Sequence, residues 1–142
     1  MNVELHQIDS GNIDQVKVVF SCVLPVSYPS SFYRDMEKGK LYGRLAVIKR
    51  RAVGCVAWTY ESGVVHVLAL GVLATHRLQG VATQLLEACL MDAKHAYLYV
   101  QANNPAVQFY SKRGFNVVKT VEDYYKRVSC TTALKMECII SE

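Results

Sequence analysis

The sequence predicts a mixed α+β fold whose central sheet has about seven strands. Two observations lead to this prediction. Three β-patterned segments follow one another in the middle of the chain with only short links between them, as in an antiparallel meander. The apolar spacing then changes from two to about 3.6 residues and back, which predicts a helix between two strands. The expected order is β-α-α-β-β-β-α-β-α-β-β.

The first part of the chain carries one predicted strand and two predicted helices. Residues 2–8 alternate between apolar and polar side chains and predict a strand. Asn12 suits a helix N-cap, the apolar residues after it recur at helical spacing, and Pro25 ends this helix. A short second helix is expected from residue 30 or 31 until Gly39 ends it.

The middle of the chain predicts the meander. Its strands are expected at 41–48, 53–60 and 64–73. The links between them, 49–52 and 61–63, have the length of hairpin connections. Neighbouring strands of this region should therefore run antiparallel.

The second half predicts two more helices and three more strands. After Gly80 the apolar residues recur at helical spacing, and a strand follows at 96–101. The strands on either side of that helix should lie parallel and adjacent. Pro105 suits the first turn of another helix, which Gly114 ends. Two final strands should form a closing hairpin, at 115–120 and 132–139.

Length and composition fit one domain, residues 1–142. A chain of 142 residues, 51% of them hydrophobic, can bury a core but is too short for two full domains. Lys and Arg number 16 against 12 Asp and Glu, so the net charge is +4, and the basic residues are spread along the chain. This pattern argues against specific nucleic-acid binding and suits a polyanionic small ligand such as a nucleotide cofactor.

The cysteines and the N-terminus bear on the compartment. The 5 cysteines include no C-x-x-C pair and no His/Cys spacing of a zinc site, so we expect neither disulfides nor a metal. The first residues lack the basic region and apolar core of a signal peptide, and no apolar run approaches membrane-spanning length. We expect a cytoplasmic protein, with the nucleus as the alternative, and no membrane association.

A short motif between the third meander strand and its helix carries the first functional signal. Arg77, Gly80, Ala82 and Thr83 stand in the pattern R-x-x-G-x-A-T. A turn at a helix N-terminus presents unpaired N–H groups and the positive end of the helix dipole, and Gly and Ala keep side chains out of the way. The pattern predicts a pyrophosphate site. The alternative is an ordinary tight turn before a helix.

A second motif lies downstream and reads N-x-x-A-x-x-F-Y-x-K-x-G-F from Asn103 to Phe115. In this order, and between these predicted elements, the two motifs resemble the GNAT acetyltransferase superfamily. Segments 24–28, 70–74 and 124–127 are similar to the NatE-type protein N-alpha-acetyltransferases, and the resemblance spans the chain. It implies the GNAT fold, in which one pair of parallel strands splays apart.

The resemblance implies how acetyl-CoA is bound. Backbone groups of Leu70, Gly71 and Val72 would pair with the pantetheine arm and stabilise the oxyanion that forms on the thioester carbonyl. The first motif would hold the pyrophosphate, and Asn103 would hydrogen-bond the coenzyme. Tyr110 would lie near the sulfur as the general acid for the departing thiolate.

The resemblance also implies a catalytic base. In the family a Tyr on the first splayed strand and a His on the second hold a water that takes the proton from the amine. This sequence carries His66 and Tyr99 at those positions, so the pair is exchanged between the strands and which of the two is the base stays open. The structural alternatives are a core histidine at His66, a sheet-packing tyrosine at Tyr99 and a core aromatic at Tyr110.

A peptide-binding slot is implied as well. Its lining would be Leu24, Pro25, Val26 and Tyr28 on one side, Leu68 on the strand, and Tyr124, Tyr125 and Val128 on the other side. An apolar, aromatic slot favours a long unbranched side chain, so a starting Met is the expected guest. Alternatively, Tyr124 and Tyr125 are aromatics of an edge strand.

The implied function is transfer of acetyl from acetyl-CoA to the α-amine of proteins that start with Met followed by an apolar residue, by direct attack in a ternary complex. No cysteine lies within either motif, which argues against an acyl-enzyme. Protein N-termini would be the substrate, and a NatA-type complex and the ribosome are candidate partners.

Two alternative functions remain. An acetyltransferase for a lysine side chain or a small amine would need carboxylates that segments 24–28 and 124–128 lack. An acetyl-CoA-binding scaffold subunit of a larger N-terminal acetyltransferase complex would keep both motifs without turnover.

Overall fold

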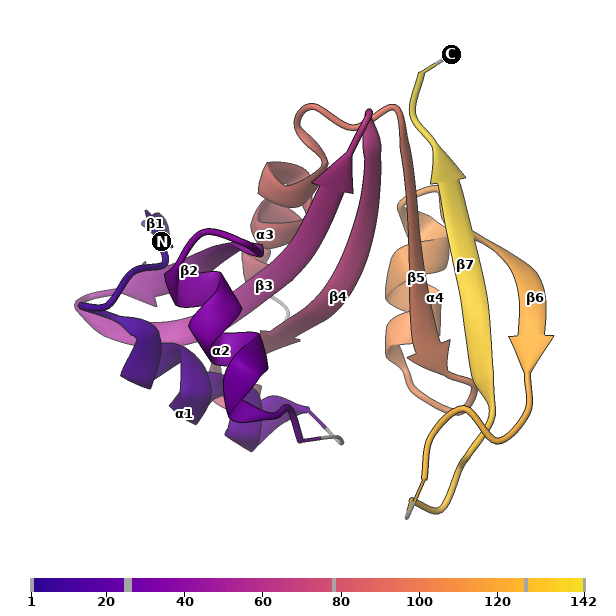
Figure 1. Ribbon diagram of the computed structural model, residues 1–142, viewed down its shortest axis with the longest axis horizontal. Coiled ribbons are helices and arrows are strands. Elements are labelled where there is room, and N and C mark those ends of the chain that lie inside the picture. Colours follow the sequence, from indigo (N-terminus) through magenta and orange to yellow (C-terminus); the bar gives the residue numbers. More distant parts are fainter. Residues whose placement is uncertain (1, 25–26, 78, 127, 142) are drawn as a thin grey trace. The chain divides into compact units, whose positions relative to one another are not determined.

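The computed structural model describes residues 2–24, 27–77, 79–126 and 128–141. The elements, in chain order, are β1 (Glu4–Gln7), α1 (Ile13–Val23), α2 (Ser30–Glu37), β2 (Tyr42–Ile48), β3 (Arg51–Glu61), β4 (Val64–Val72), the 3-10 turn η1 (Ala74–His76), α3 (Val81–Leu90), β5 (His95–Gln101), α4 (Ala106–Lys112), β6 (Asn116–Val121) and β7 (Ala133–Ile139) (Figure 1). This is the predicted order with η1 added, so the predicted α+β class is confirmed.

The strands of the described residues form a 7-stranded sheet in the order β1-β2-β3-β4-β5-β7-β6. The predicted parallel pair is β4 with β5, in register from Val64 opposite His95 to Val67 opposite Leu98. The predicted closing hairpin is β6 with β7, which run antiparallel. Strand β7 lies between β5 and β6, so the last strand of the chain, not the one before it, adjoins β5.

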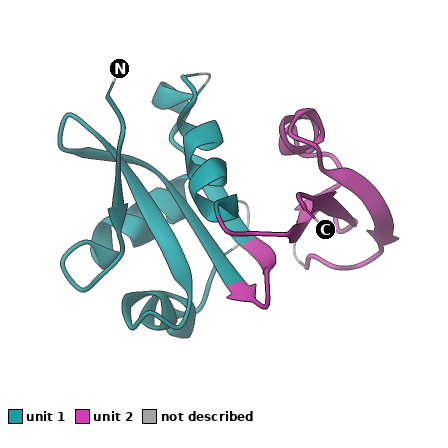
Figure 2. Ribbon diagram, turned by 90° about the horizontal axis from the view of Figure 1, so that it is seen from above, with its two compact units in different colours: residues 1–59, 68–91 teal, residues 60–67, 92–142 magenta. Residues whose placement is uncertain are grey.

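Contacts along the chain divide it into two compact units, which Figure 2 colours separately. Unit 1 comprises residues 1–59 and 68–91, and unit 2 comprises residues 60–67 and 92–142. The prediction of one domain over 1–142 stays a prediction beside this division.

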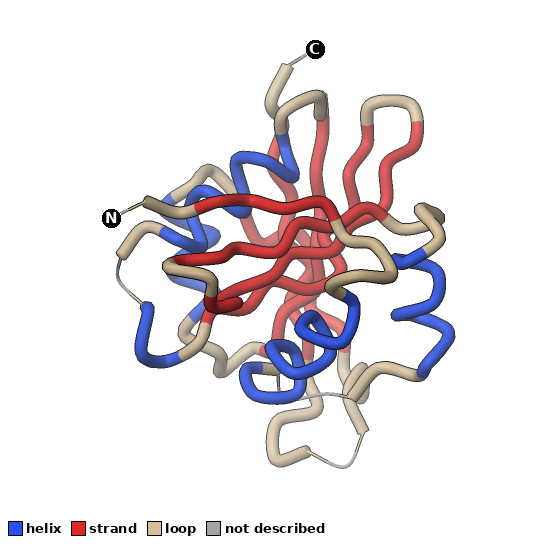
Figure 3. The backbone as a smooth tube through the Cα atoms, turned by 90° about the vertical axis from the view of Figure 1, so that its left-hand side faces the viewer, coloured by secondary structure: helices blue, strands red, loops and turns tan. Residues whose placement is uncertain are grey.

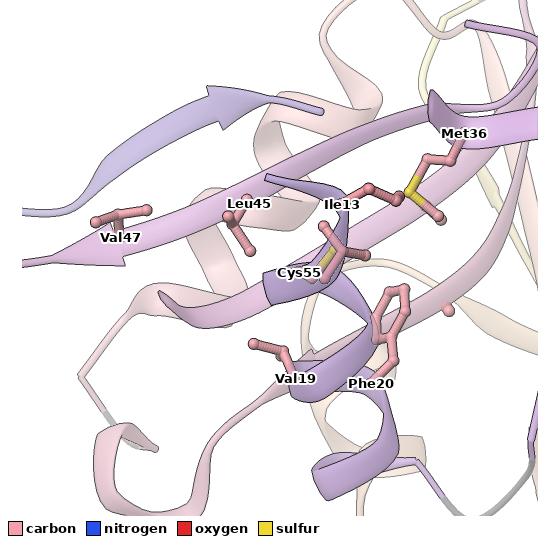
Figure 4. Close-up of a cluster of buried hydrophobic side chains, with 10 residues drawn as sticks. Ile13, Val19, Phe20, Met36, Leu45, Val47 and Cys55 are labelled. Carbon is pink, nitrogen blue, oxygen red and sulfur yellow. The ribbon is translucent and has the colours of Figure 1, made fainter. Parts of the chain in front are cut away.

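Unit 1 is built around β2 and β3, which are buried on both faces. Helices α1 and α2 lie over one face and α3 lies over the other (Figure 1). On the α1 and α2 face, the buried side chains labelled in Figure 4 come from both helices and both strands: Ile13, Val19, Phe20, Met36, Leu45, Val47 and Cys55. On the other face, Leu85 of α3 packs near the backbone of Gly54. Burial on two sides explains the nearly continuous apolar sequence of both strands.

The strands of unit 2 are fully buried on one face only. Alternate residues of β5, such as Leu98, are buried together with Met136 of β7 and Phe115, which follows α4. The residues between them, such as Tyr97 and Tyr99, are half-buried and share the other face of the strand. This uneven burial leaves one face of β4, β5 and β7 to carry polar and aromatic side chains.

Two turns differ from the prediction in their local chemistry. The β2–β3 hairpin, which can be followed in Figure 3, turns on two residues, Lys49 and Arg50, where a four-residue link was expected. Both have positive φ, 49° and 66°, as a tight primed turn requires. Asn12 precedes α1 as predicted, but its side-chain amide donates to the carbonyl of Gln7 and its Oδ1 accepts from the N–H of Asp9. It closes the turn before the helix instead of capping it.

None of the helices in the described part of the chain combines the length and the apolarity needed to span a membrane.

Candidate active site

Unit 1 contains the end of β4 and the turn after it, two segments that the family resemblance assigns to acetyl-CoA. Leu70 and Gly71 are half-buried and Val72 is buried. A Cβ at Gly71 would overlap Cγ2 of Val23, so the last turn of α1 packs directly against the strand backbone here. Only glycine permits this approach. The segment that the family resemblance assigns to pantetheine is therefore held in place by α1.

Arg77 is anchored to the end of β4 by its own side chain. Its Nε donates a hydrogen bond to the carbonyl O of Val72 at 3.1 Å, although the residue as a whole is exposed. Because a guanidinium carries five N–H donors, this bond leaves its terminal nitrogens for other partners. The result is a positive charge fixed beside the turn that precedes α3.

The start of α3 has the features of an anion site. Gly80 is the N-cap residue at φ +80°, in the left-handed region that glycine tolerates. Among the described residues, no side chain caps this helix and its first turn holds no acidic residue. Ala82 and Thr83 are half-buried in that turn. The positive end of the helix dipole therefore faces a site without a built-in carboxylate.

The loop between α1 and α2 supplies the predicted slot residues of unit 1. Leu24 and Tyr28 are half-buried and pack against the core of this unit, whereas Pro25 and Val26 lie outside the described residues. The Tyr28 ring stacks on Phe32 with centroids 4.2 Å apart, and its hydroxyl donates to the carbonyl of Leu68. Tyr28 thus ties this loop to β4.

Leu24 and Tyr28 also border a cavity of about 410 Å³ within unit 1. The cavity is lined by Lys17, Val18, Phe20, Ser21, Leu24, Ser27, Tyr28 and Tyr33. Two of the predicted slot residues therefore face open space beside the loop.

In unit 2, rings from β4 and β5 contact one another on the half-buried face. The His66 imidazole lies nearly parallel to the Tyr97 ring, with centroids 4.3 Å apart and planes at 17°. Tyr99 meets His66 edge-on at 5.9 Å and stacks on Tyr124 at 4.9 Å. The predicted pair His66 and Tyr99 is therefore brought into one cluster, and Tyr124 adjoins it.

The electrostatics of this face favour a neutral His66. Burial lowers the pKa of its imidazole, and the positive charge of Lys135 on β7 lowers that pKa further. Lys135 lies with its Nζ 5.0 Å from the centroid of Tyr97 and 3.3 Å from Oε1 of Glu137. A neutral imidazole has a free lone pair and can accept a proton near neutral pH.

Tyr110 and Asn103 are the predicted coenzyme residues of unit 2. Tyr110, on α4, is only 7% exposed, and its ring packs edge-on against Phe115 at 5.6 Å. This burial is consistent with the structural alternative for Tyr110, a core aromatic. Asn103 is exposed in the loop before α4, while its neighbour Asn104 fixes that loop by accepting from the N–H of Ala106 at 2.8 Å.

The remaining predicted slot residues lie in the connection between β6 and β7. Tyr124 is 44% exposed and Tyr125 and Val128 are half-buried. Burial raises the pKa of the Tyr124 hydroxyl, and Tyr99 raises it further. The alternative that Tyr124 and Tyr125 belong to an edge strand is wrong, because β6 ends at Val121 and both follow it in the turn region.

Sequence reasoning missed Tyr97, Lys135 and Glu137 as members of the cluster. Alternation along β5 puts Tyr97 on the same face as Tyr99, and this signal was available. The contribution of Lys135 and Glu137 depends on β7 adjoining β5, which no local pattern in the sequence specifies.

The buried thiols of Cys55 and Cys89 are in an unreactive state. Burial raises the pKa of Cys89 to about 12 and also raises that of Cys55. Because the thiolate is the nucleophilic form, neither residue is prepared to carry an acyl group. This agrees with direct attack, the step expected from the sequence.

Comparisons with known proteins place the chain in a family. A family model described as an acetyltransferase (GNAT) domain matches residues 12–138. N-alpha-acetyltransferase 50 of Danio rerio is 35% identical over 138 aligned positions, covering 89% of this chain and 82% of that protein. The probable N-acetyltransferase san of Drosophila melanogaster is 35% identical over 139 positions, covering 89% of this chain and 75% of that protein.

A solved structure gives the same relationship in three dimensions. Arabidopsis thaliana Naa50, in complex with the bisubstrate analogue CoA-Ac-MVNAL, superposes with a TM-score of 0.87 at 28% identity. The match covers 99% of this chain and 100% of that one. The resemblance to NatE-type enzymes noted in the sequence is thereby confirmed, and the chain belongs to the GNAT acetyltransferase family.

Proposed function

We propose that this chain transfers acetyl from acetyl-CoA to the α-amine of proteins that begin with Met followed by an apolar residue. The relatives support both substrates: one is named an N-alpha-acetyltransferase, and another is solved with an analogue that joins CoA to a peptide lettered MVNAL. The observation that carries the proposal is the half-buried imidazole of His66 in contact with Tyr99, because the family resemblance assigns the base to this pair and an imidazole can accept a proton.

In this proposal acetyl-CoA binds the residues that the family resemblance assigns to it. The pyrophosphate is bound by the terminal nitrogens of the Arg77 guanidinium. The N–H groups at the start of α3, around Gly80, Ala82 and Thr83, bind it as well. The backbone of Leu70, Gly71 and Val72 pairs with the pantetheine arm and polarises the thioester carbonyl. Asn103 adds a hydrogen bond to the coenzyme. No metal takes part, and this expectation stays a prediction.

Deprotonation of the amine is the task of His66 and Tyr99. An N-terminal α-amine has a pKa of about 7.7–8.0, so part of it is already neutral in the cell. His66 takes the remaining proton through a water that Tyr99 also binds. Its lowered pKa suits this role, because the imidazole stays neutral at pH values where an ordinary histidine is partly protonated. His66 is therefore the base, and Tyr99 orients the water.

The transfer itself is a direct substitution at the thioester carbon. The neutral amine nitrogen forms the new C–N bond and then releases one proton to solvent through the same water, the C–S bond breaks, and the coenzyme leaves as a thiolate. Tyr110 donates its proton to that thiolate and regains one from solvent. A phenol of pKa about 10 can protonate a thiolate whose conjugate acid has a comparable pKa, about 8.5 or somewhat higher.

The peptide is bound by the slot residues. The residues that the family resemblance assigns to the slot are Leu24, Pro25, Val26, Tyr28, Leu68, Tyr124, Tyr125 and Val128. These side chains are apolar or aromatic, so a Met side chain gains more from burial than a charged one does. No carboxylate belongs to this set, which disfavours a lysine side chain or a polyamine as acceptor.

A panel of peptides with free N-termini tests the proposal. The panel varies the first two residues, and blocked peptides with an internal Lys and a polyamine are included as competing acceptors. We expect the highest kcat/KM for Met followed by Leu or Val. Faster acetylation of internal Lys or of the polyamine would overturn the substrate assignment.

The scaffold alternative is separated by a second measurement. If the chain only bound acetyl-CoA, the coenzyme would raise its Tm while no acceptor was turned over. His66→Phe should lower kcat strongly and leave that coenzyme-induced rise in Tm intact. An unchanged kcat in this variant would return His66 to a structural role.

The same family resemblance supports a proposal about partners and location. We place the chain in the cytoplasm, in contact with a NatA-type complex on ribosomes. Co-sedimentation of the tagged chain with ribosomes, with and without that complex, tests this part separately.

A further inference from the structure

Three strands of unit 2 place His66, Tyr97 and Glu137 in one row across the sheet. His66 on β4 is opposite Tyr97 on β5, and Tyr97 is opposite Glu137 on β7. Lys135 belongs to the next row, opposite Tyr99, but its ammonium reaches the Tyr97 ring at 5.0 Å. Tyr97 therefore has an imidazole stacked on it from β4 and a cation beside it from β7.

The position of the Lys135 ammonium is fixed by two contacts. Besides the Tyr97 ring it has the carboxylate of Glu137, with Nζ 3.3 Å from Oε1. Only 27% of the Lys135 side chain is exposed, so solvent screens this charge less than it screens a lysine on an open surface. A long flexible side chain is held in one place by a cation–π contact and an ion pair together.

We propose that Lys135 is a positioning residue of the acetyl-transfer reaction: its held positive charge opposes protonation of the neighbouring His66 and keeps that imidazole ready to accept a proton. The inference rests on the proposed function of His66 as the base. It adds a residue outside both sequence motifs, and it gives Tyr97, which contacts both His66 and Lys135, the role of holding the imidazole ring in place.

The other charged groups on this face act in both directions, because the Glu137 carboxylate offsets part of the Lys135 charge and Lys119 adds to it. Glu137 is shared, because its Oε2 lies 3.8 Å from Nε2 of His95 while its Oε1 pairs with Lys135. Lys119 on β6 is opposite Lys135, so it adds positive charge on the side of β7 that is away from β5. From the β3 side, Tyr60 and Glu61 are exposed at the hairpin end.

The remaining titratable groups on this face are the phenols of three tyrosines. Tyr97 and Tyr99 on β5, and Tyr124 in the connection after β6, contact the imidazole or one another. Phenols are neutral at the pH at which His66 titrates. Consistent with this balance, the pKa of His66 is lowered first by burial and then by the charge of Lys135.

The direct test is an NMR titration of the His66 imidazole in the intact chain. His66 is assigned by comparison with His66→Gln, and the titration is repeated in K135R, K135Q and K135E. We expect the His66 pKa to be unchanged in K135R, higher in K135Q and highest in K135E. Because the readout is the imidazole itself, a loss of activity from any other cause does not affect it. Lys40→Gln, on an exposed turn of unit 1, removes one positive charge elsewhere and should leave the titration unchanged.

A kinetic test uses the ratio of variant to wild-type kcat/KM with a Met-Leu peptide. The substrate amine titrates identically in every variant, so its effect cancels in the ratio. At pH 8 His66 is neutral in all of them, and the ratio for K135Q should be close to one. At pH 6 that ratio should fall, and K135R should restore it.

Each outcome decides a separate point. A His66 titration that is the same in K135Q and wild type overturns the inference, even if His66→Phe is inactive and the proposed function stands. A titration that shifts as expected, with His66→Phe fully active, keeps the electrostatic coupling but removes His66 from catalysis and with it the role of Lys135 in the reaction.

Discussion

The hydroxyl of Tyr28 donates a hydrogen bond to the backbone carbonyl of Leu68, with an O–O distance of 3.2 Å. It links the loop after α1 to the strand that carries His66. Two predicted slot residues are therefore positioned by one another, and the bond can be removed without changing the shape of the slot.

Tyr28→Phe should raise the KM for a Met-Leu peptide a few-fold, because a net hydrogen bond contributes about 1 kcal/mol. The KM for acetyl-CoA should stay the same. Steady-state kinetics with each substrate varied in turn give both values. Tyr60→Phe, which removes an exposed hydroxyl at the end of β3, is the matched control. Equal changes in the two KM values would argue against a role for Tyr28 in the slot.

Arg77→Met should raise the KM for acetyl-CoA by about tenfold or more, since a hydrogen bond to a charged group is worth roughly 1.5–3 kcal/mol. The same variant should use S-acetylpantetheine, which has no pyrophosphate, as well as the wild type does. Arg50→Met, at the exposed β2–β3 turn, controls for the loss of one charge. If both acetyl donors are affected equally, Arg77 acts on the end of β4 through Val72 and not on the pyrophosphate.

Two substitutions at Tyr97 distinguish the effect of ring stacking from the chemistry of the hydroxyl. Tyr97→Phe keeps the ring against His66 and should have a kcat near that of the wild type. Tyr97→Leu removes the parallel stack, worth about 0.5–1.5 kcal/mol, and should lower kcat several-fold because the imidazole is less well oriented. Single-turnover rates at saturating substrate measure the difference. A low rate in Tyr97→Phe would instead point to the phenol hydroxyl.

Gly71→Ala should destabilise the fold by about 1–3 kcal/mol, because the new methyl group collides with Val23 at the end of α1. Val23→Ala in the same chain should recover part of that loss by vacating the space. Urea unfolding of the two single variants and the double variant gives the coupling energy. Strictly additive effects would contradict the close packing of α1 on β4.

Most elements could be predicted from the sequence because their signals are local. The helix after Gly80 and the strands on either side of it follow from the spacing of apolar residues, and Gly39 and Gly114 mark helix ends with positive φ. The β2–β3 hairpin was expected to need a longer link, because Lys and Arg are poor markers of a turn that needs positive φ.

The candidate site was predictable to the extent that it lies in motifs. Arg77 is marked by the first motif and Asn103 by the family resemblance, whereas Lys135 is marked by neither, because its place beside Tyr97 depends on β7 entering the sheet next to β5. Tyr124 and Tyr125 were open to two interpretations, since adjacent aromatics suit both a strand and a turn. Long-range strand order decides these cases, and hydropathy patterns do not encode it directly.

Strand β6 ends the sheet, and its residues from Asn116 to Thr120 are exposed. Val117 and Val118 are about half exposed, at 49% and 52%, which would suit pairing with the same strand of another molecule. Lys119 follows them directly and would bring like charges together if two such edges aligned. The Lys119 charge disfavours aggregation through this edge. Replacing Lys119 with Val is therefore expected to lower the solubility of the protein more than it changes the rate of acetyl transfer.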